Sequence, residues 1–189
     1  LNNIPELFFP LENRAPFYLL IEATSGSKNV PLDIILTDIM NWGMDEAIII
    51  DGALANSEAQ KAAFWRLRED QPEGQRKLGP QLKHDLSVPI SRLEEFLVSA
   101  NDKSLSILNN VRINAFGHLG DGNIHYNISP PIGQKNFSGL DNEFANKLSE
   151  LASNLGGSFA AEHGIGRTKT ILADGLRDSS ERDLMKRIK

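Results

Sequence analysis

The 189-residue sequence contains no cysteine. This absence excludes disulfide bonds, a thiolate nucleophile, iron–sulfur clusters and every zinc site that uses a cysteine ligand. Any metal that the chain binds must therefore be held by imidazole and oxygen ligands. Imidazole is itself scarce, because the chain has only four histidines.

Two further features are missing. There is no run of lysine and arginine and the net charge is −5, so we expect no binding to nucleic acid. No apolar stretch approaches the roughly 18 residues of a membrane-spanning helix, and the start shows no signal-peptide pattern. We expect a globular, cytoplasmic protein, which could lie at the periphery of the inner membrane.

The first half of the chain predicts alternating strands and helices. The apolar runs 16–24 and 46–51 are typical of buried strands, and the patterns of 31–43 and 56–70 are typical of helices. Residues 71–81 combine proline, glycine and charge, so we expect a loop there and the best internal boundary.

The second half predicts a ferredoxin-like β-α-β-β-α-β pattern over residues 83–162, which is an antiparallel sheet with helices packed on one face. The elements are a strand in 83–89, a helix in 89–100, two strands in 110–129, a helix in 141–157 and a short strand that starts at 157. The first seventy residues would add a β-α-β-α unit to the same architecture. We therefore expect the α+β class.

Half of the histidines lie in the segment "FGHLGDGNIHYN", residues 116–127. Asp121-Gly122 is a strong signal for a two-residue hairpin turn, which would pair His118 with His125. Paired residues point to the same face with Cβ atoms about 4.5–5.5 Å apart, so the two imidazoles could converge on one metal ion. Asn127 would lie on the same face as His125.

This segment also has simpler interpretations. A histidine pair on an exposed sheet face needs no metal, and a one-residue change of register would place the rings on opposite faces. Gly117, Gly120 and Gly122 lie between predicted strands with no helix after them, so we reject a dinucleotide-binding loop.

A second segment, "AAEHGIG", supplies a carboxylate at the end of a strand of small residues. Glu162 would complete a set of two histidines and one carboxylate that leaves coordination positions open for substrate. His163 would then be a free imidazole close to the metal. Its alternative interpretation is a loop histidine that forms a hydrogen bond with the backbone.

These two segments, together with "KHDLSVP" and "FWRLRE", resemble the C-terminal substrate domain of the FAD-linked oxidase family. Members of this family include D-lactate dehydrogenase, the flavin subunit of glycolate oxidase and D-2-hydroxyglutarate dehydrogenase. The resemblance covers roughly residues 17–189, and four motifs in the right order make it specific.

The resemblance implies a role for each candidate residue. His118, His125 and Glu162 look like the family's divalent-metal ligands, for which zinc is usual and iron or manganese are alternatives. His163 matches the family's base, and Asn127 matches a substrate-contacting position.

Arg68 and Lys83 match cationic positions that hold the substrate carboxylate. Arginine offers a carboxylate a two-pronged fork and lysine offers a point charge. Solvated surface charge is the alternative interpretation of both residues. His84 matches no family role and reads as an ordinary strand residue.

The resemblance implies FAD-dependent oxidation of a D-2-hydroxy acid, of the D-lactate, D-2-hydroxyglutarate or glycolate class, to its 2-oxo acid. The metal would lower the pKa of the substrate hydroxyl, His163 would take the proton, and hydride would pass to the flavin. The alternatives are a metal-dependent hydrolase or metal-binding module without redox chemistry, and a non-haem iron oxygenase.

Residues 1–189 would then be the C-terminal substrate- and metal-binding domain of a larger flavoenzyme. The chain begins at Leu1 and stops at "RDLMKRIK", and nothing in it resembles the family's FAD-binding domain. We expect this fragment alone to bind no flavin and to be inactive. Its partners would be the hydroxy acid, the flavin domain of the same polypeptide and an electron acceptor, and it could form a homodimer.

Overall fold

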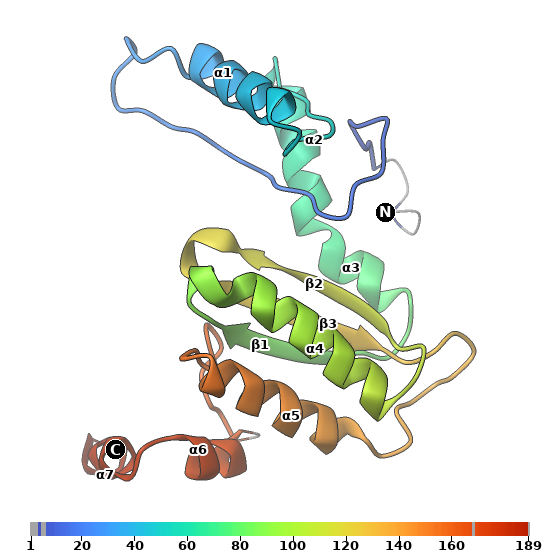
Figure 1. Ribbon diagram of the computed structural model, residues 1–189, viewed down its shortest axis with the longest axis vertical. Coiled ribbons are helices and arrows are strands. Elements are labelled where there is room, and N and C mark those ends of the chain that lie inside the picture. Colours follow the sequence, from blue (N-terminus) through green and yellow to red (C-terminus); the bar gives the residue numbers. More distant parts are fainter. Residues whose placement is uncertain (1–3, 5–6, 168, 189) are drawn as a thin grey trace. The chain divides into compact units, whose positions relative to one another are not determined.

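The computed structural model describes residues 4, 7–167 and 169–188 and divides the chain into two units, Leu1–Leu78 and Gly79–Lys189 (Figure 1). The division falls inside 71–81, where the sequence predicted a boundary. The prediction that this stretch is a loop is wrong in its first part, because α3 spans Gln71–Arg76. Pro72 suits the first turn of a helix, where its missing N–H group has no partner to lose.

The first unit contains helices but no strand among its described residues, 4 and 7–78. Its other helices are α1, Leu32–Asp45, and α2, Glu58–Glu69, close to the predicted ranges. The predicted strands at 16–24 and 46–51, and with them the β-α-β-α addition, are wrong for this structure. A strand needs the backbone of a neighbour, and neither segment is paired.

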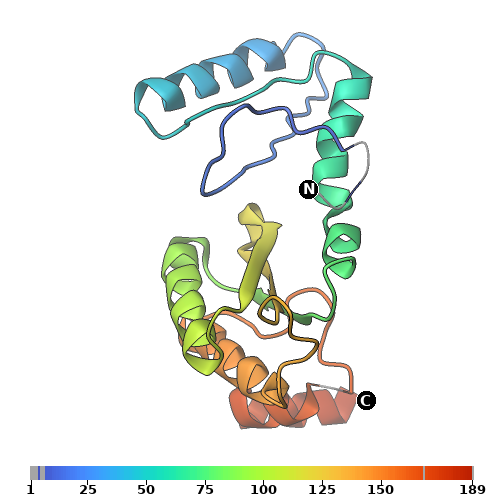
Figure 2. The same ribbon diagram turned by 90° about the vertical axis from the view of Figure 1, so that its right-hand side faces the viewer.

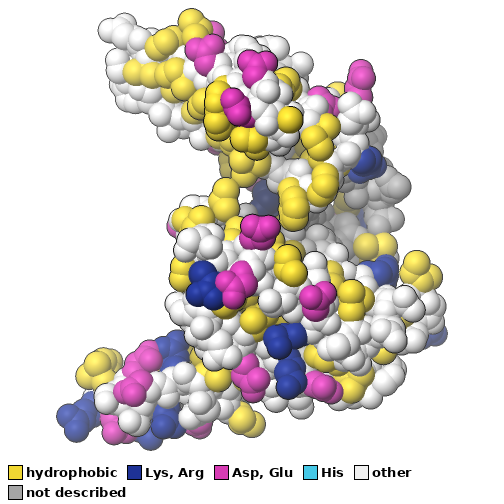
Figure 3. All heavy atoms as spheres, in the orientation of Figure 1, with side chains coloured by type: hydrophobic (Ala, Val, Ile, Leu, Met, Phe, Trp, Pro, Cys, Tyr) yellow, Lys and Arg dark blue, Asp and Glu magenta, His cyan; other side chains and the backbone are white. Residues whose placement is uncertain are grey.

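Most apolar side chains of those two segments are exposed rather than buried, and apolar side chains cover much of the surface of this unit in Figure 3. The exposed residues in the two segments are Phe17, Tyr18, Leu19, Leu20, Ile21, Ile48 and Ile50.

The second unit is built on a three-stranded antiparallel sheet with the strand order β1-β3-β2. The strands are β1, Leu82–Ser87, β2, Arg112–His118, and β3, Asn123–Ser129. Its helices are the short η1, Ile90–Arg92, followed by α4, Leu93–Ile107, α5, Asp141–Asn154, α6, Thr170–Leu176, and α7, Ser179–Ile188. The α+β class is confirmed. No helix in the described part of the chain is both long and apolar enough to span a membrane.

Helices α4 and α5 cover one face of the sheet (Figures 1 and 2). From β3, this face presents Ile124, Tyr126 and Ile128, all buried. They pack in one core with helical side chains that include Phe96, Phe144 and Leu148. The Tyr126 hydroxyl donates a hydrogen bond to Asn101 Oδ1 (2.8 Å), and burial raises the pKa of Tyr126 to about 12. Because side chains alternate along a strand, the opposite face of β3 is left for polar residues.

The predicted fourth strand is reduced to a single bridge. Ser87 N–H donates to Ser158 O (2.8 Å), and Ser158 N–H donates back to Ser87 O (2.9 Å). Beyond this bridge, side chains rather than a neighbouring strand form hydrogen bonds with the backbone of this segment. Ala160 N–H donates to Ser158 Oγ (3.2 Å), and Phe159 O accepts from Lys169 Nζ (2.8 Å). The β-α-β-β-α-β order is therefore kept, with its last strand cut short.

The hairpin between β2 and β3 differs in register from the prediction. His118 pairs with Asn123 and Phe116 pairs with His125, so the predicted pairing of His118 with His125 is wrong by two residues. A two-residue type I′ turn requires a positive φ at both central residues, and Asp121 does not adopt one. The loop instead contains the 3₁₀ turn η2, Leu119–Asp121, followed by Gly122 at φ 62°.

The shift of two residues preserves which face each side chain occupies, because the side-chain period along a strand is two residues. His118 and His125 thus remain on one face despite the wrong pairing.

Gly122 gives a test of this loop. Its φ is positive and a Cβ at this position would overlap the carbonyl oxygen of Val88, whereas a Cβ on Gly120 would meet nothing within 4 Å. Gly122→Ala should therefore lower the free energy of unfolding by about 2 kcal/mol or more, since the left-handed conformation alone costs an L-residue roughly 1–2 kcal/mol. The measurement is urea denaturation of both variants. Equal stability of Gly122→Ala and the control Gly120→Ala would contradict the loop geometry.

Candidate metal and substrate site

The sheet face opposite α4 and α5 carries most of the predicted site residues. β1 and β3 pair Asp85 with His125 and Lys83 with Asn127. On the other side of β3, Phe116 pairs with His125, and their ring centroids lie 5.1 Å apart. Each of these residues shares a face with its partner because directly paired residues point the same way.

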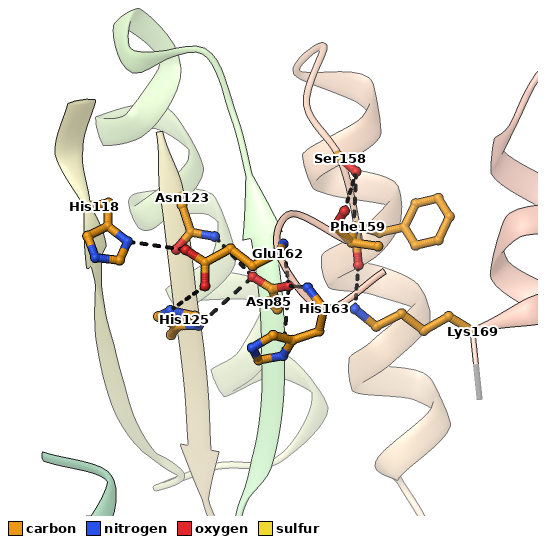
Figure 4. A network of polar contacts seen from close by, with 10 residues as sticks. Asp85, His118, Asn123, His125, Ser158, Phe159, Glu162, His163 and Lys169 are labelled. Atoms are coloured by element: carbon orange, nitrogen blue, oxygen red, sulfur yellow. Dashed lines mark hydrogen bonds and ion pairs between the residues drawn. The ribbon is translucent and has the colours of Figure 1, made fainter. Parts of the chain in front are cut away.

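Three predicted residues meet at the end of this face. His118, His125 and Glu162 each offer one ligand atom, and these atoms lie within 4.8 Å of one another. His118 Nδ1 lies 3.2 Å from Glu162 Oε1, and His125 Nε2 lies 3.6 Å from Glu162 Oε2 (Figure 4). The Glu162 carboxylate thus lies between two imidazoles from neighbouring strands.

The spacing of this cluster fits a divalent cation. Two ligand atoms bound at about 2.1 Å to a tetrahedral zinc ion are roughly 3.4 Å apart, close to the two distances found here. Two imidazoles and one carboxylate are also a set that zinc or iron accepts, with positions left open. The cluster is accessible, since the side chains of His118 and Glu162 are 52% and 42% exposed and that of His125 is 16% exposed.

His163 lies beside the three-residue cluster without being part of it. Its ring stacks near that of His125, with centroids 6.0 Å apart and an angle of 29° between the planes. Its side chain is largely exposed, and Nδ1 lies 3.9 Å from Asp85 Oδ2. An imidazole in this position can reach a small molecule bound at the cluster without being a ligand itself.

Asp85 is the part of the site that sequence reasoning missed. Its buried carboxylate accepts three hydrogen bonds, two at Oδ2 from the N–H groups of Glu162 (2.8 Å) and His163 (2.9 Å) and one at Oδ1 from Asn123 Nδ2 (3.0 Å). Burial by itself would raise the pKa of Asp85, but the bonds from His163, Glu162 and Asn123 outweigh it and lower the pKa. The available signal was a carboxylate in an otherwise buried strand, which must find donors.

The predicted substrate residues divide between the two units. Lys83 is exposed on β1, beside its buried partner Asn127 on β3. Arg68 lies on α2 in the first unit. The second unit alone therefore provides all the predicted site residues except Arg68.

His84 points into the helix-covered side of the sheet, as expected for an ordinary strand residue. It is 9% exposed, and its buried Nε2 has no hydrogen-bond partner in the described part of the chain. Burial lowers the pKa of His84 to about 4, and the charge of Lys169 adds to the effect.

The α+β domain thus gathers two histidines and a glutamate on one open sheet face, a set of side chains that could hold one metal ion. The family described as "FAD linked oxidases, C-terminal domain" matches residues 3–189. The chain therefore belongs to the FAD-linked oxidase family.

Curated relatives agree with this assignment. "D-2-hydroxyglutarate dehydrogenase, mitochondrial" of Arabidopsis thaliana is 31% identical over 89% of this chain and 29% of its own length. D-2-hydroxyglutarate dehydrogenase of Xanthomonas citri pv. viticola is 30% identical over 95% of this chain and 38% of its own length. A putative mitochondrial D-lactate dehydrogenase of Schizosaccharomyces pombe is 32% identical over 95% of this chain and 35% of its own length. The chain thus spans about a third of the length of these relatives.

The buried His84 predicts how stability depends on pH. The unfolded chain takes up a proton near the usual histidine pKa of about 6.5, whereas the folded protein resists protonation of His84 down to about 4. The free energy of unfolding should therefore fall as the pH is lowered through this window, by up to about 3 kcal/mol from this residue. His84→Leu should remove that part of the slope. Parallel stability–pH curves for the variant and the wild type, measured by urea denaturation, would contradict the burial.

Proposed function

We propose that this chain supplies the metal- and substrate-binding part of a flavoenzyme that oxidises a D-2-hydroxy acid to the 2-oxo acid. The carrying observation is the pair of distances from Glu162, 3.2 Å to His118 and 3.6 Å to His125, which suit one shared divalent ion. Family membership and the names of the relatives support the reaction class. D-2-hydroxyglutarate is the favoured substrate because relatives from a plant and a bacterium carry that name.

His118, His125 and Glu162 would hold the ion, for which we propose zinc, with iron or manganese as alternatives. A bound divalent ion would polarise the substrate oxygens and lower the pKa of the hydroxyl group. FAD, held mainly by a separate domain of the same polypeptide, would accept the hydride. The exposed side chains of His118 and Glu162 would leave a bound ion accessible to the substrate.

His163 would act as the base that takes the hydroxyl proton. It lies next to Glu162 in the chain, yet its ring lies near the His125 ring and the Asp85 carboxylate (Figure 4). It is not one of the three residues whose ligand atoms cluster. Its exposed ring could accept a proton from the substrate and pass it to solvent.

Lys83 and Asn127 would hold the substrate carboxylate on the same sheet face, and Arg68 stays a substrate-binding residue predicted from the sequence. A dicarboxylate such as 2-hydroxyglutarate has two anionic ends, and a cationic side chain such as Lys83 suits either of them. A homodimer and a cytoplasmic, membrane-peripheral location stay predictions from the sequence.

The assignment of His163 as base and Glu162 as ligand can be tested in the full-length enzyme. His163→Asn should keep its metal and flavin while kcat falls about 10²–10⁴-fold, the usual range for a missing general base. Glu162→Gln should instead lose the metal. Metal analysis and steady-state rates with a dye acceptor provide the measurements.

The two roles are reversed if the histidine variant loses metal and the glutamate variant keeps it. A full-length wild-type protein that shows no flavin absorbance and hydrolyses a substrate through a metal-bound water would favour the non-redox alternative instead.

Lys83→Ala and Arg68→Ala should mainly raise the KM for the hydroxy acid. Each removes one charge-assisted contact, worth about 1.5–3 kcal/mol, which corresponds to roughly a ten- to hundredfold change. Metal content should change little, because neither side chain belongs to the cluster. Lys103→Ala, an exposed lysine on α4, is the matched control. An unchanged KM in both variants would indicate that Lys83 and Arg68 are ordinary surface charges without a role in substrate binding.

A further inference from the structure

The segment that carries Glu162 and His163 lies outside every helix and strand. Among the described residues, its last backbone–backbone hydrogen bonds with the sheet are those of the bridge between Ser87 and Ser158. Four and five residues further on, the N–H groups of Glu162 and His163 both donate to Asp85 Oδ2. These bonds join positions 77 and 78 residues apart in the sequence, so one carboxylate ties this segment to β1.

The Asp85 carboxylate is itself held in place. It belongs to β1, where it pairs with His125, and Asn123 Nδ2 donates to its second oxygen at 3.0 Å. His125 lies between two carboxylates: Nδ1 is 3.9 Å from Asp85 Oδ1, and Nε2 is 3.6 Å from Glu162 Oε2. Asp85 therefore faces the His125 ring and the Glu162 backbone from the same strand position.

We propose that Asp85 is a positioning residue, whose carboxylate places the Glu162 backbone and orients the His125 ring so that the three ligand atoms of the cluster converge. It also fixes the backbone from which His163 projects. The consequence for metal affinity rests on the proposed function, whereas the anchoring of the segment does not.

Two physical arguments support this role. Hydrogen bonds to an ionised carboxylate are roughly twice as strong as neutral ones, and Asp85 is buried, so water cannot readily replace it. A histidine that binds a metal through one nitrogen usually directs the other N–H toward a carboxylate or carbonyl, which fixes the ring. Asp85 is the carboxylate on that side of His125.

Two substitutions separate the contributions of Asp85. Asp85→Ala removes both acceptor oxygens. Asp85→Asn keeps the shape and one carbonyl acceptor without the charge, and its new amide could donate to Asn123 Oδ1, a buried oxygen that has no partner in the described structure. The matched control is Ser87→Ala, on the same strand and face, because Ser87 contacts Ser158 through its backbone.

The first measurement is hydrogen–deuterium exchange in the metal-free, full-length protein. Exchange over residues 160–166 should rise from wild type to Asp85→Asn to Asp85→Ala. Exchange in β1 and β3 should not change in these variants, and the Ser87→Ala control should exchange like the wild type throughout. If Asp85→Ala does not fold, the comparison of Asp85→Asn with wild type carries the same test. Unchanged exchange of this segment in the folded variants would overturn the proposal.

The second measurement is titration of the same metal-free proteins with Zn²⁺. Asp85→Ala should bind zinc about 10–100-fold more weakly than wild type, the usual effect of removing a partner behind a metal ligand, with Asp85→Asn between them. If the wild type binds zinc and the variants bind it equally well, the positioning role of Asp85 is contradicted but the proposed function is not. A wild type that binds no zinc contradicts the proposed function, and hydrogen exchange then decides the anchoring role by itself.

Discussion

Side chains alternate between two faces along an antiparallel strand, and the central strand β3 uses both faces fully. Ile124, Tyr126 and Ile128 face the helices and form the core. On the other side, His125 and Asn127 carry the candidate chemistry. Because β3 is paired on both sides, its neighbours β1 and β2 are held at fixed register, and each adds polar groups to the same face. The position of the site is therefore set by the same pairing that builds the core.

Two histidines show how strongly this alternation decides a role. His84 and His125 lie on neighbouring strands, one residue apart in register, and so point to opposite faces. His84 is buried beneath helices, where its pKa falls to about 4 and it stays neutral at physiological pH. His125 remains partly open beside Glu162. His84 faces the apolar core with its partner Tyr126, whereas His125 faces the side of the sheet on which Glu162 lies.

Local signals in the sequence predicted the second unit well. Periodicity predicted α4, α5 and the two strands of the hairpin, and the segments around His118, His125 and Glu162 were identified by residue type. The hairpin register was wrong because turn chemistry alone does not reveal that Asp121 avoids a positive φ, yet the even shift kept both histidines on one face.

The failures share a cause, which is dependence on distant partners. The apolar runs 16–24 and 46–51 resemble strands, but a strand exists only where another backbone pairs with it. The role of Asp85 was missed as well, because two of its three donors lie 77 and 78 residues further along the chain. The resemblance to a family located the candidate metal ligands, whereas the carboxylate that holds the Glu162 backbone became visible only in three dimensions.

The central claim is that His118, His125 and Glu162 hold one divalent ion. The most direct measurement is a crystal structure of the zinc-loaded full-length protein with anomalous data collected at the zinc edge. The account predicts one strong peak bonded to an imidazole nitrogen of each histidine and to Glu162, at about 2.0–2.2 Å. A peak elsewhere, or no peak between these three side chains at saturating zinc, would contradict it.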